Sequence, residues 1–129
     1  MHLLSSALML DWSQGDLYEG LRCYRAEQFF EAHEHWEAVW LQAAEPEKTF
    51  LQALIQVAGA FHHFRRGNLN GARSMIHKAL LRLGRYPEIF GSVAVEHLRA
   101  DLQGCLVALE TELVTMPAIP PIELLPPSH

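Results

Sequence analysis

Apolar side chains recur with the period of an α-helix along most of the chain, and turn-forming residues separate the helical stretches. The spacing predicts helices over residues 16–24, 28–44, 46–66, 69–83 and 93–114. Short connections usually join antiparallel neighbours, so the two central helices should form a hairpin. We therefore expect an all-α fold, a compact bundle of about five helices with a central antiparallel hairpin.

The predicted bundle domain covers residues 13–114, between an N-terminal segment, residues 1–12, and a tail, residues 115–129. The tail carries five of the seven prolines and cannot form a helix. Its isoleucines and leucines are too apolar for a purely solvated segment. We expect this Pro-rich tail to lie extended against its own bundle or against a second subunit.

Local signals mark several of the connections. Gly67 is expected to end one helix and Asn68 to cap the next. In the loop that follows, Tyr86 and Phe90 could close over the bundle. Gly104 weakens the last helix, which suggests that another element packs closely against it.

The helix over residues 28–44 places two polar residues in the middle of an aromatic face. At about 100° per residue, His33 and Glu37 share this face. Its aromatic members are Phe29, Phe30, Trp36 and Trp40. Because a helix buries such a face, we expect the aromatic residues and the His33–Glu37 pair in the core. A buried glutamate must be hydrogen-bonded, protonated or bound to a cation, and residues four apart can share a hydrogen bond or an ion.

The helix over residues 46–66 adds a second polar line, formed by Gln52, Gln56 and His63. His62 projects about 100° away from His63, so the two are not expected to serve one small site equally. Gly59 and the neighbouring alanines permit a close approach of the helices. Gln56 or one histidine could then reach the His33–Glu37 pair.

The segment His33-x-x-x-Glu37-x-x-Trp40 resembles the signature of the family called domain of unknown function 309, HxxxExx followed by Trp or Tyr. The surrounding sequence resembles the family core over roughly residues 20–84. The family is all-helical and occurs in bacteria and archaea, so the resemblance implies an all-helical fold. It also implies a metal-binding role for His33 and Glu37, with Trp40 as their packing neighbour, and it implies no particular reaction.

One hypothesis for the pair is a metal site. His33 and Glu37 would be ligands, His62 or His63 a third, and water would complete the shell. Such a set suits zinc, iron or manganese. An open position could activate water for hydrolysis, with Glu34 as the nearest base. The HExxE segment lacks the second histidine of HExxH, which excludes the zinc-protease mechanism of that motif.

Other hypotheses stay open. His33, Glu37 and the Gln52, Gln56 and His63 line could form a buried hydrogen-bond network that fixes helix register, and the pattern alone favours this network over an ion site. Metal-free acid–base catalysis is a further option, as is a small-molecule pocket anchored by His33 and Glu37. A different class is a helical interaction module or a homodimer, in which the tail and exposed aromatic residues engage another protein.

Composition and charge narrow the classes of protein to which this chain can belong. A chain of 129 residues, half of them apolar, suffices for one domain with a core. With a net charge of −5 and Arg65–Arg66 as the main basic cluster, we expect no nucleic-acid partner. No apolar run approaches the ~20 residues of a membrane span, and the first residues lack the basic start of a signal peptide. Cys23 and Cys105 are expected to be free and buried, as in a cytoplasmic protein.

Overall fold

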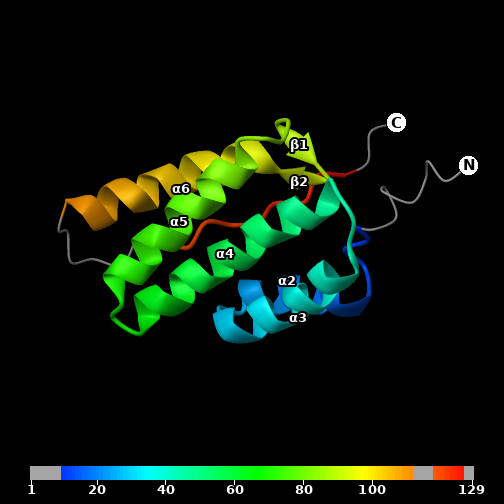
Figure 1. Cartoon of the computed structure of the whole chain (residues 1–129), viewed down its shortest axis with the longest axis horizontal. Coiled ribbons are helices and arrows are strands. Elements are labelled where there is room, and N and C mark those ends of the chain that lie inside the picture. Colours follow the sequence, from blue (N-terminus) through cyan, green and yellow to red (C-terminus); the bar gives the residue numbers. More distant parts are fainter. Residues whose placement is uncertain (1–9, 112–117, 127–129) are drawn as a thin grey trace, which may run out of the picture.

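The computed structural model describes residues 10–111 and 118–126. In these ranges the chain forms five helices and a two-stranded hairpin: α2 (Gly15–Arg25), α3 (Phe29–Gln42), α4 (Glu47–Arg65), α5 (Leu69–Leu83), β1 (Ile89–Phe90), β2 (Val93–Ala94) and α6 (Val95–Glu110). Each helix packs against the next along the chain. Figure 1 shows α4 between α5 and α3. The predicted helical bundle with its central hairpin, α3 and α4, is confirmed.

The turn between α4 and α5 follows the predicted capping signals. Gly67 has a φ of +77°, a left-handed conformation that glycine adopts without a Cβ penalty. The side chain of Asn68 accepts a hydrogen bond of 2.9 Å from the backbone nitrogen of Gly71. This bond satisfies one of the free N–H groups at the start of α5.

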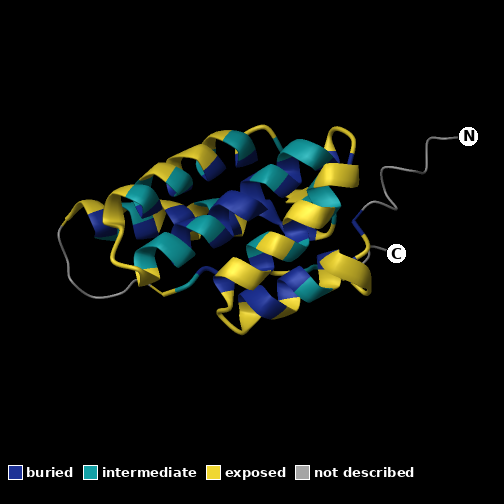
Figure 2. Cartoon of the chain, turned by 60° about the horizontal axis from the view of Figure 1, so that its bottom comes forward, coloured by how far each residue is buried: buried dark blue, intermediate teal, exposed yellow. Residues whose placement is uncertain are grey.

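The apolar stripe of α4 forms the centre of the core (Figure 2). Phe50, Leu54, Val57 and Phe61 recur at intervals of three or four residues and are almost completely buried. Burying a side chain of this size contributes about 1.5–3 kcal/mol. None of the helices among the described residues has the length and apolar character that a membrane span requires.

A close contact between α2 and α3 was not anticipated from the sequence. The indole of Trp36 is fully buried and donates a hydrogen bond of 3.2 Å from Nε1 to the carbonyl of Leu17. It lies directly on Gly20, where an added Cβ would come within 2.3 Å of the indole ring. The missing side chain at Gly20 therefore sets the distance between the two helices.

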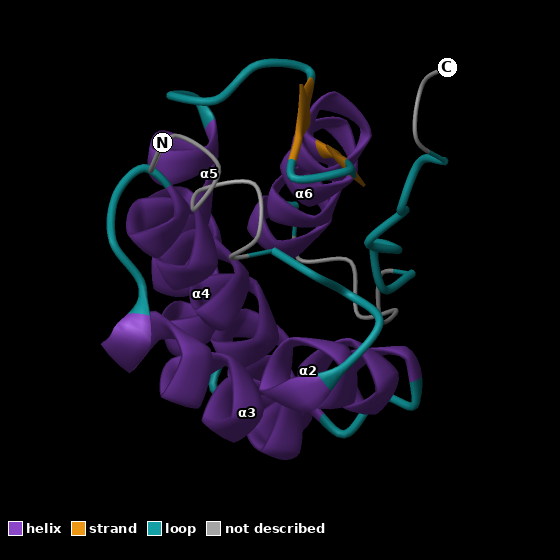
Figure 3. Ribbon diagram, turned by 90° about the vertical axis from the view of Figure 1, so that its right-hand side faces the viewer, coloured by secondary structure: helices purple, strands orange, loops and turns teal. Residues whose placement is uncertain are grey.

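The tail over residues 118–126 is extended and contacts its own bundle, as one of the two expectations for it stated. The hydroxyl of Tyr24 on α2 donates a hydrogen bond of 2.6 Å to the carbonyl of Pro120. Arg25 bonds the carbonyl of Ile122, and the Ile122 side chain is only 1% exposed. In Figure 3 the tail runs along the right-hand side of the bundle, beside α6 and above α2.

The start of the last helix was predicted two residues too early. Val93 and Ala94 form β2, which pairs antiparallel with β1, and Val93 also bridges to Leu124 of the tail. Ser92 has a φ of +68°, so the chain turns sharply before β2. Pairing with β1 across this turn and with the distant tail keeps these residues extended, and α6 begins at Val95. The predicted end at Val114 lies outside the described residues.

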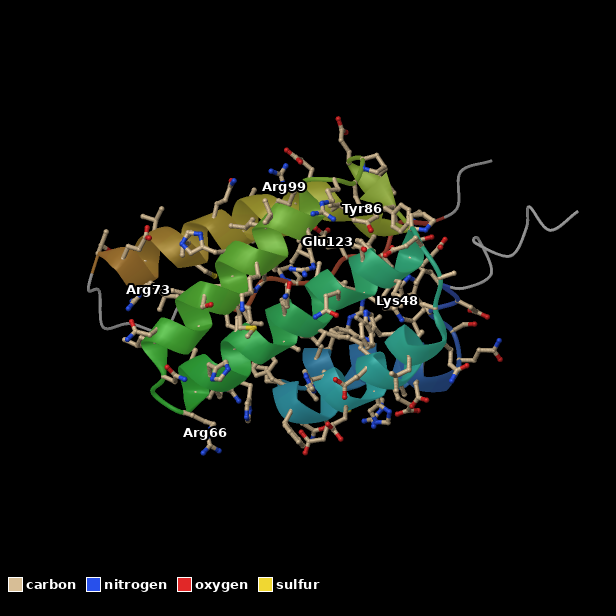
Figure 4. All side chains as sticks on the ribbon, viewed as in Figure 1. Lys48, Arg66, Arg73, Tyr86, Arg99 and Glu123 are labelled. Carbon is tan, nitrogen blue, oxygen red and sulfur yellow. The ribbon has the colours of Figure 1, made fainter. Side chains whose placement is uncertain are left out.

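The loop after α5 closes over the bundle as predicted. The ring centroids of Tyr86 and Phe90 lie 5.3 and 4.9 Å from that of Phe50. The Tyr86 hydroxyl donates a hydrogen bond of 2.6 Å to the carbonyl of Pro46 at the start of α4. Figure 4 shows Tyr86 on the side of the bundle where α4 begins. The loop therefore fixes one end of the central helix.

The expectation of close packing at Gly104 is wrong. A Cβ added there would meet no atom within 4 Å, because this position lies on the outer side of α6. The cysteines agree with the prediction, since Cys23 and Cys105 are both free and buried.

Cys105 gives the stability a dependence on alkaline pH. Burial raises the pKa of its thiol from 9.0 to about 11. Above about pH 9 the unfolded thiol loses its proton while the native thiol keeps it, so the free energy of unfolding should fall as the pH rises towards 11. Urea unfolding at pH 7, 9 and 10.5 should show a shallower fall for Cys105→Ala than for the wild type. Cys23→Ala controls for the loss of a buried thiol, and an identical fall in the wild type and Cys105→Ala would contradict the assignment.

Candidate functional site

A cavity of about 480 Å³ lies along α4, between α3 and α5. We call it the α4 groove. Its lining residues are Phe30, His33, Glu37, Trp40, Gln52, Ile55, Gln56, Gly59, His62, His63, Met75 and Lys78. Of the site residues suggested by the sequence, all but Glu34 line this groove.

The lining follows from helical spacing. Residues three or four positions apart share a face, so α3 and α4 each present one stripe to the groove and a different stripe to the core. Gly59 leaves a bare position along the α4 stripe, and an added Cβ there would meet only Met75, with Sδ at 3.8 Å. The missing side chain at Gly59 leaves the groove open at this point of α4.

The prediction that the His33–Glu37 pair lies in the core is wrong. The side chain of His33 is 31% exposed, and Glu37 is exposed. Phe30, also expected in the core, is 51% exposed. Helix α3 instead packs through Phe29 and Trp36, which were predicted correctly. Helix α3 carries aromatic residues on two neighbouring faces. The face with Phe29 and Trp36 is buried, and the face with Phe30 lines the groove.

Trp40 is half-buried at one end of the groove. The ammonium group of Lys48 lies 4.0 Å from the centroid of its ring and donates a hydrogen bond to the Trp40 carbonyl. This cation–π contact fixes the indole. The predicted role of Trp40 as a packing neighbour of the pair agrees with its place in the lining.

The predicted hydrogen-bond network does not form among the described residues. His33 Nδ1 is buried and has no hydrogen-bond partner, so it does not bond Glu37. The Gln56 side chain, also buried, accepts a bond of 3.3 Å from Arg82 on α5 instead. Gln56 and His63, whose Nδ1 lies 3.2 Å from Asn68 Nδ2, therefore bond to residues outside the groove lining, and His33 Nδ1 is left without a partner.

His33, Glu34 and Glu37 form a group that could hold a metal ion. One ligand atom from each residue lies within 4.8 Å of the others, and His33 Nδ1 is 3.8 Å from Glu34 Oε2. Metal–ligand bonds of about 2.0–2.2 Å place ligand atoms at most ~4.4 Å apart, so small rotations of the exposed carboxylates suffice. One imidazole and two carboxylates suit zinc, iron or manganese. Glu34, suggested by sequence as a base, completes this group.

His62 and His63 lie outside this group and line the same groove. The ring centroid of His62 is 5.6 Å from that of Phe30 and 6.2 Å from that of His63. Burial lowers the pKa of His62, helped by the positive charge of Arg66. A neutral His62 can accept a hydrogen bond or bind a metal near neutral pH. The role of the two histidines as metal ligands stays a prediction.

Comparison with known proteins agrees with the resemblance at His33, Glu37 and Trp40. Residues 17–75 match the model of a family described as Domain of unknown function (DUF309). An uncharacterized protein of Aquifex aeolicus (strain VF5) is 32% identical over 91 residues, which cover 70% of this chain. The chain spans only 27% of the length of that protein. Residues 17–75 of this chain, which carry all but one residue of the groove lining, form a DUF309 domain.

Proposed function

We propose that the protein binds a divalent metal ion through His33, Glu34 and Glu37 at the rim of the α4 groove. The observation that carries the proposal is the group of His33, Glu34 and Glu37, in which His33 Nδ1 is buried, has no partner and lies 3.8 Å from Glu34 Oε2. A buried polar atom that lacks a hydrogen bond destabilises the fold. An ion at this point would satisfy the nitrogen and both carboxylates together.

The arrangement favours a site of the open type. Three protein ligands leave coordination positions for water or a substrate, as in catalytic rather than structural zinc sites. A bound divalent ion supplies Lewis acidity and lowers the pKa of bound water. The chain itself would hold the ion on α3, and Gln52 and Gln56 on α4 offer amide groups to a molecule beside it. Metal-assisted hydrolysis is the reaction class that this arrangement suits best.

Metal uptake is the direct test. Protein purified without a histidine tag is analysed for metals and then unfolded thermally with zinc, manganese or iron(II). We expect near-stoichiometric uptake and a melting temperature that a chelator lowers, since an ion at 100 times its Kd stabilises the native state by about 2.7 kcal/mol. Glu37→Gln should abolish uptake. Glu31→Gln, an exposed change on the same helix, is the matched control. Equal uptake by the wild type and Glu37→Gln would refute the proposal.

A second set of variants separates the two possible ligand sets. If the group on α3 is the site, Glu34→Gln should weaken metal binding strongly, and His62→Gln and His63→Gln should leave it nearly unchanged. If instead His62→Gln or His63→Gln weakens metal binding and Glu34→Gln does not, the third ligand would come from α4, as the sequence suggested. Isothermal titration with the ion that binds best in the first test measures all three variants.

A further inference from the structure

The α4 groove is large enough for an organic ligand as well as an ion. Its volume of about 480 Å³ lies within the ~300–1,000 Å³ of typical small-molecule sites. One part of its lining is apolar, from Phe30, Trp40, Ile55 and Met75. The remainder is polar and comes from all three helices. A mixed lining of this kind favours a ligand with an apolar body and a few polar atoms.

Gln56 provides a buried donor inside the groove. Its side chain is 7% exposed, and its Oε1 accepts a hydrogen bond from Arg82 Nη1. Because the oxygen is held by Arg82, the amide nitrogen is the group left for a ligand, and it donates to no partner among the described residues. Gly59 lies one turn further along α4 and leaves room above it. The floor of the groove therefore presents an N–H donor that a ligand can reach.

The charges on the two walls are opposite. Glu37 lies on the α3 wall and Lys78 on the α5 wall, and both are exposed. Lys78 belongs to none of the ion pairs that the described residues form. A divalent ion on the proposed metal group would neutralise Glu34 and Glu37, leaving Lys78 as the uncompensated charge. The loaded groove would then favour an anion.

We propose that the α4 groove, with its metal bound, takes a small organic carboxylate. The carboxylate interacts with Lys78 and the amide of Gln56, and the apolar body packs on Trp40 and Met75. This inference rests on the proposed metal function, because without the ion the carboxylate of Glu37 would repel the ligand. It adds the class of molecule that the site would bind.

The test uses the full chain and a panel of aromatic and aliphatic monocarboxylates, each paired with its neutral amide and its amine. The protein is loaded with the ion that it takes up, and binding is followed by tryptophan fluorescence and by the NMR signals of the Gln56 side-chain amide. We expect at least one carboxylate to bind about tenfold more tightly than its amide or amine. Removing the ion should abolish this preference.

Two variants locate the ligand. Lys78→Met should weaken carboxylate binding about tenfold without changing the binding of neutral amides or of the metal. Arg66→Met, which removes a cation at the far end of α4 outside the groove lining (Figure 4), is the matched control. Gly59→Leu should fill the groove and abolish ligand binding while metal uptake persists. Loss of metal uptake in Gly59→Leu would mean that the added leucine side chain disturbs α3. The result for Lys78→Met would then decide whether the carboxylate binds in the groove.

The outcomes separate the two proposals. Metal uptake without any preference for carboxylates would overturn the ligand inference and leave the metal function standing. A protein that takes up no metal would overturn both. Preferential binding of amines to the metal-free protein would assign the groove to cations through Glu37 and contradict the inference directly.

Discussion

Replacing Trp36 with alanine is expected to lower the free energy of unfolding by about 3–5 kcal/mol, the usual cost of deleting a buried tryptophan side chain. The indole is fully buried between α2 and α3 and packs 5.9 Å from the ring of Tyr24. Its hydrogen bond to the carbonyl of Leu17 is lost as well. Urea unfolding measures the change. Trp40→Ala, at the half-buried tryptophan of the same helix, is the control and should cost markedly less.

The same contact can be tested from the other helix. Glycine to alanine inside a helix normally stabilises by about 0.5–1 kcal/mol. At Gly20 the added Cβ would overlap the Trp36 indole, so we expect Gly20→Ala to destabilise instead, by about 1–3 kcal/mol. Gly104→Ala, where no atom lies within 4 Å, should show the normal gain. A gain in both variants would mean that α2 and α3 are not in this close contact.

The fold was largely predictable because its signals are local. The turn at Gly67 and Asn68 and the apolar stripe of α4 each follow from a few neighbouring residues. The start of α6 was not predictable in this way. Val93 and Ala94 fit a helical pattern. They stay extended because they pair with β1 across a short turn and with the tail, which is distant in the sequence.

The sequence predicted which residues line the candidate site, but it did not predict how deeply they are buried. Spacing on α3 and α4 brought His33, Glu37, Gln56 and His63 to one place, and the groove contains all four. Periodicity could not decide which aromatic face of α3 enters the core, because that depends on where α2 packs. Trp36 packs against α2 at Gly20, where no side chain is in the way. This contact places the His33–Glu37 stripe on the outer side of α3.

The same limit applies to the metal group. Glu34 lies about 100° from His33 around the helix, which favoured a solvated role for it while the pair was expected in the core. Because the pair lies at an open groove, the exposed carboxylate of Glu34 can turn towards it without being removed from water. The three residues then come together. The proposal of Glu34 as the third ligand therefore follows from how the helix is buried and not from the motif.

Replacing Ile122 with alanine is expected to lower the free energy of unfolding by about 2–5 kcal/mol, because this side chain of the tail is as deeply buried as those of the helices. Ile89→Ala, at an isoleucine that is 53% exposed, should cost little and is the matched control. Denaturant unfolding gives the two values.

The loss at Ile122 could be global or confined to the tail, and amide exchange separates the two. The backbone nitrogens of Ala94 and Leu125 donate hydrogen bonds to Glu123 and Ser92, so they report on the tail contact. If the tail opens separately, their exchange should accelerate in Ile122→Ala while the amides of α4 stay protected. If the tail is part of the cooperative core, exchange should accelerate in both. Unchanged stability together with unchanged exchange at Ala94 and Leu125 would contradict the place of Ile122 in the core.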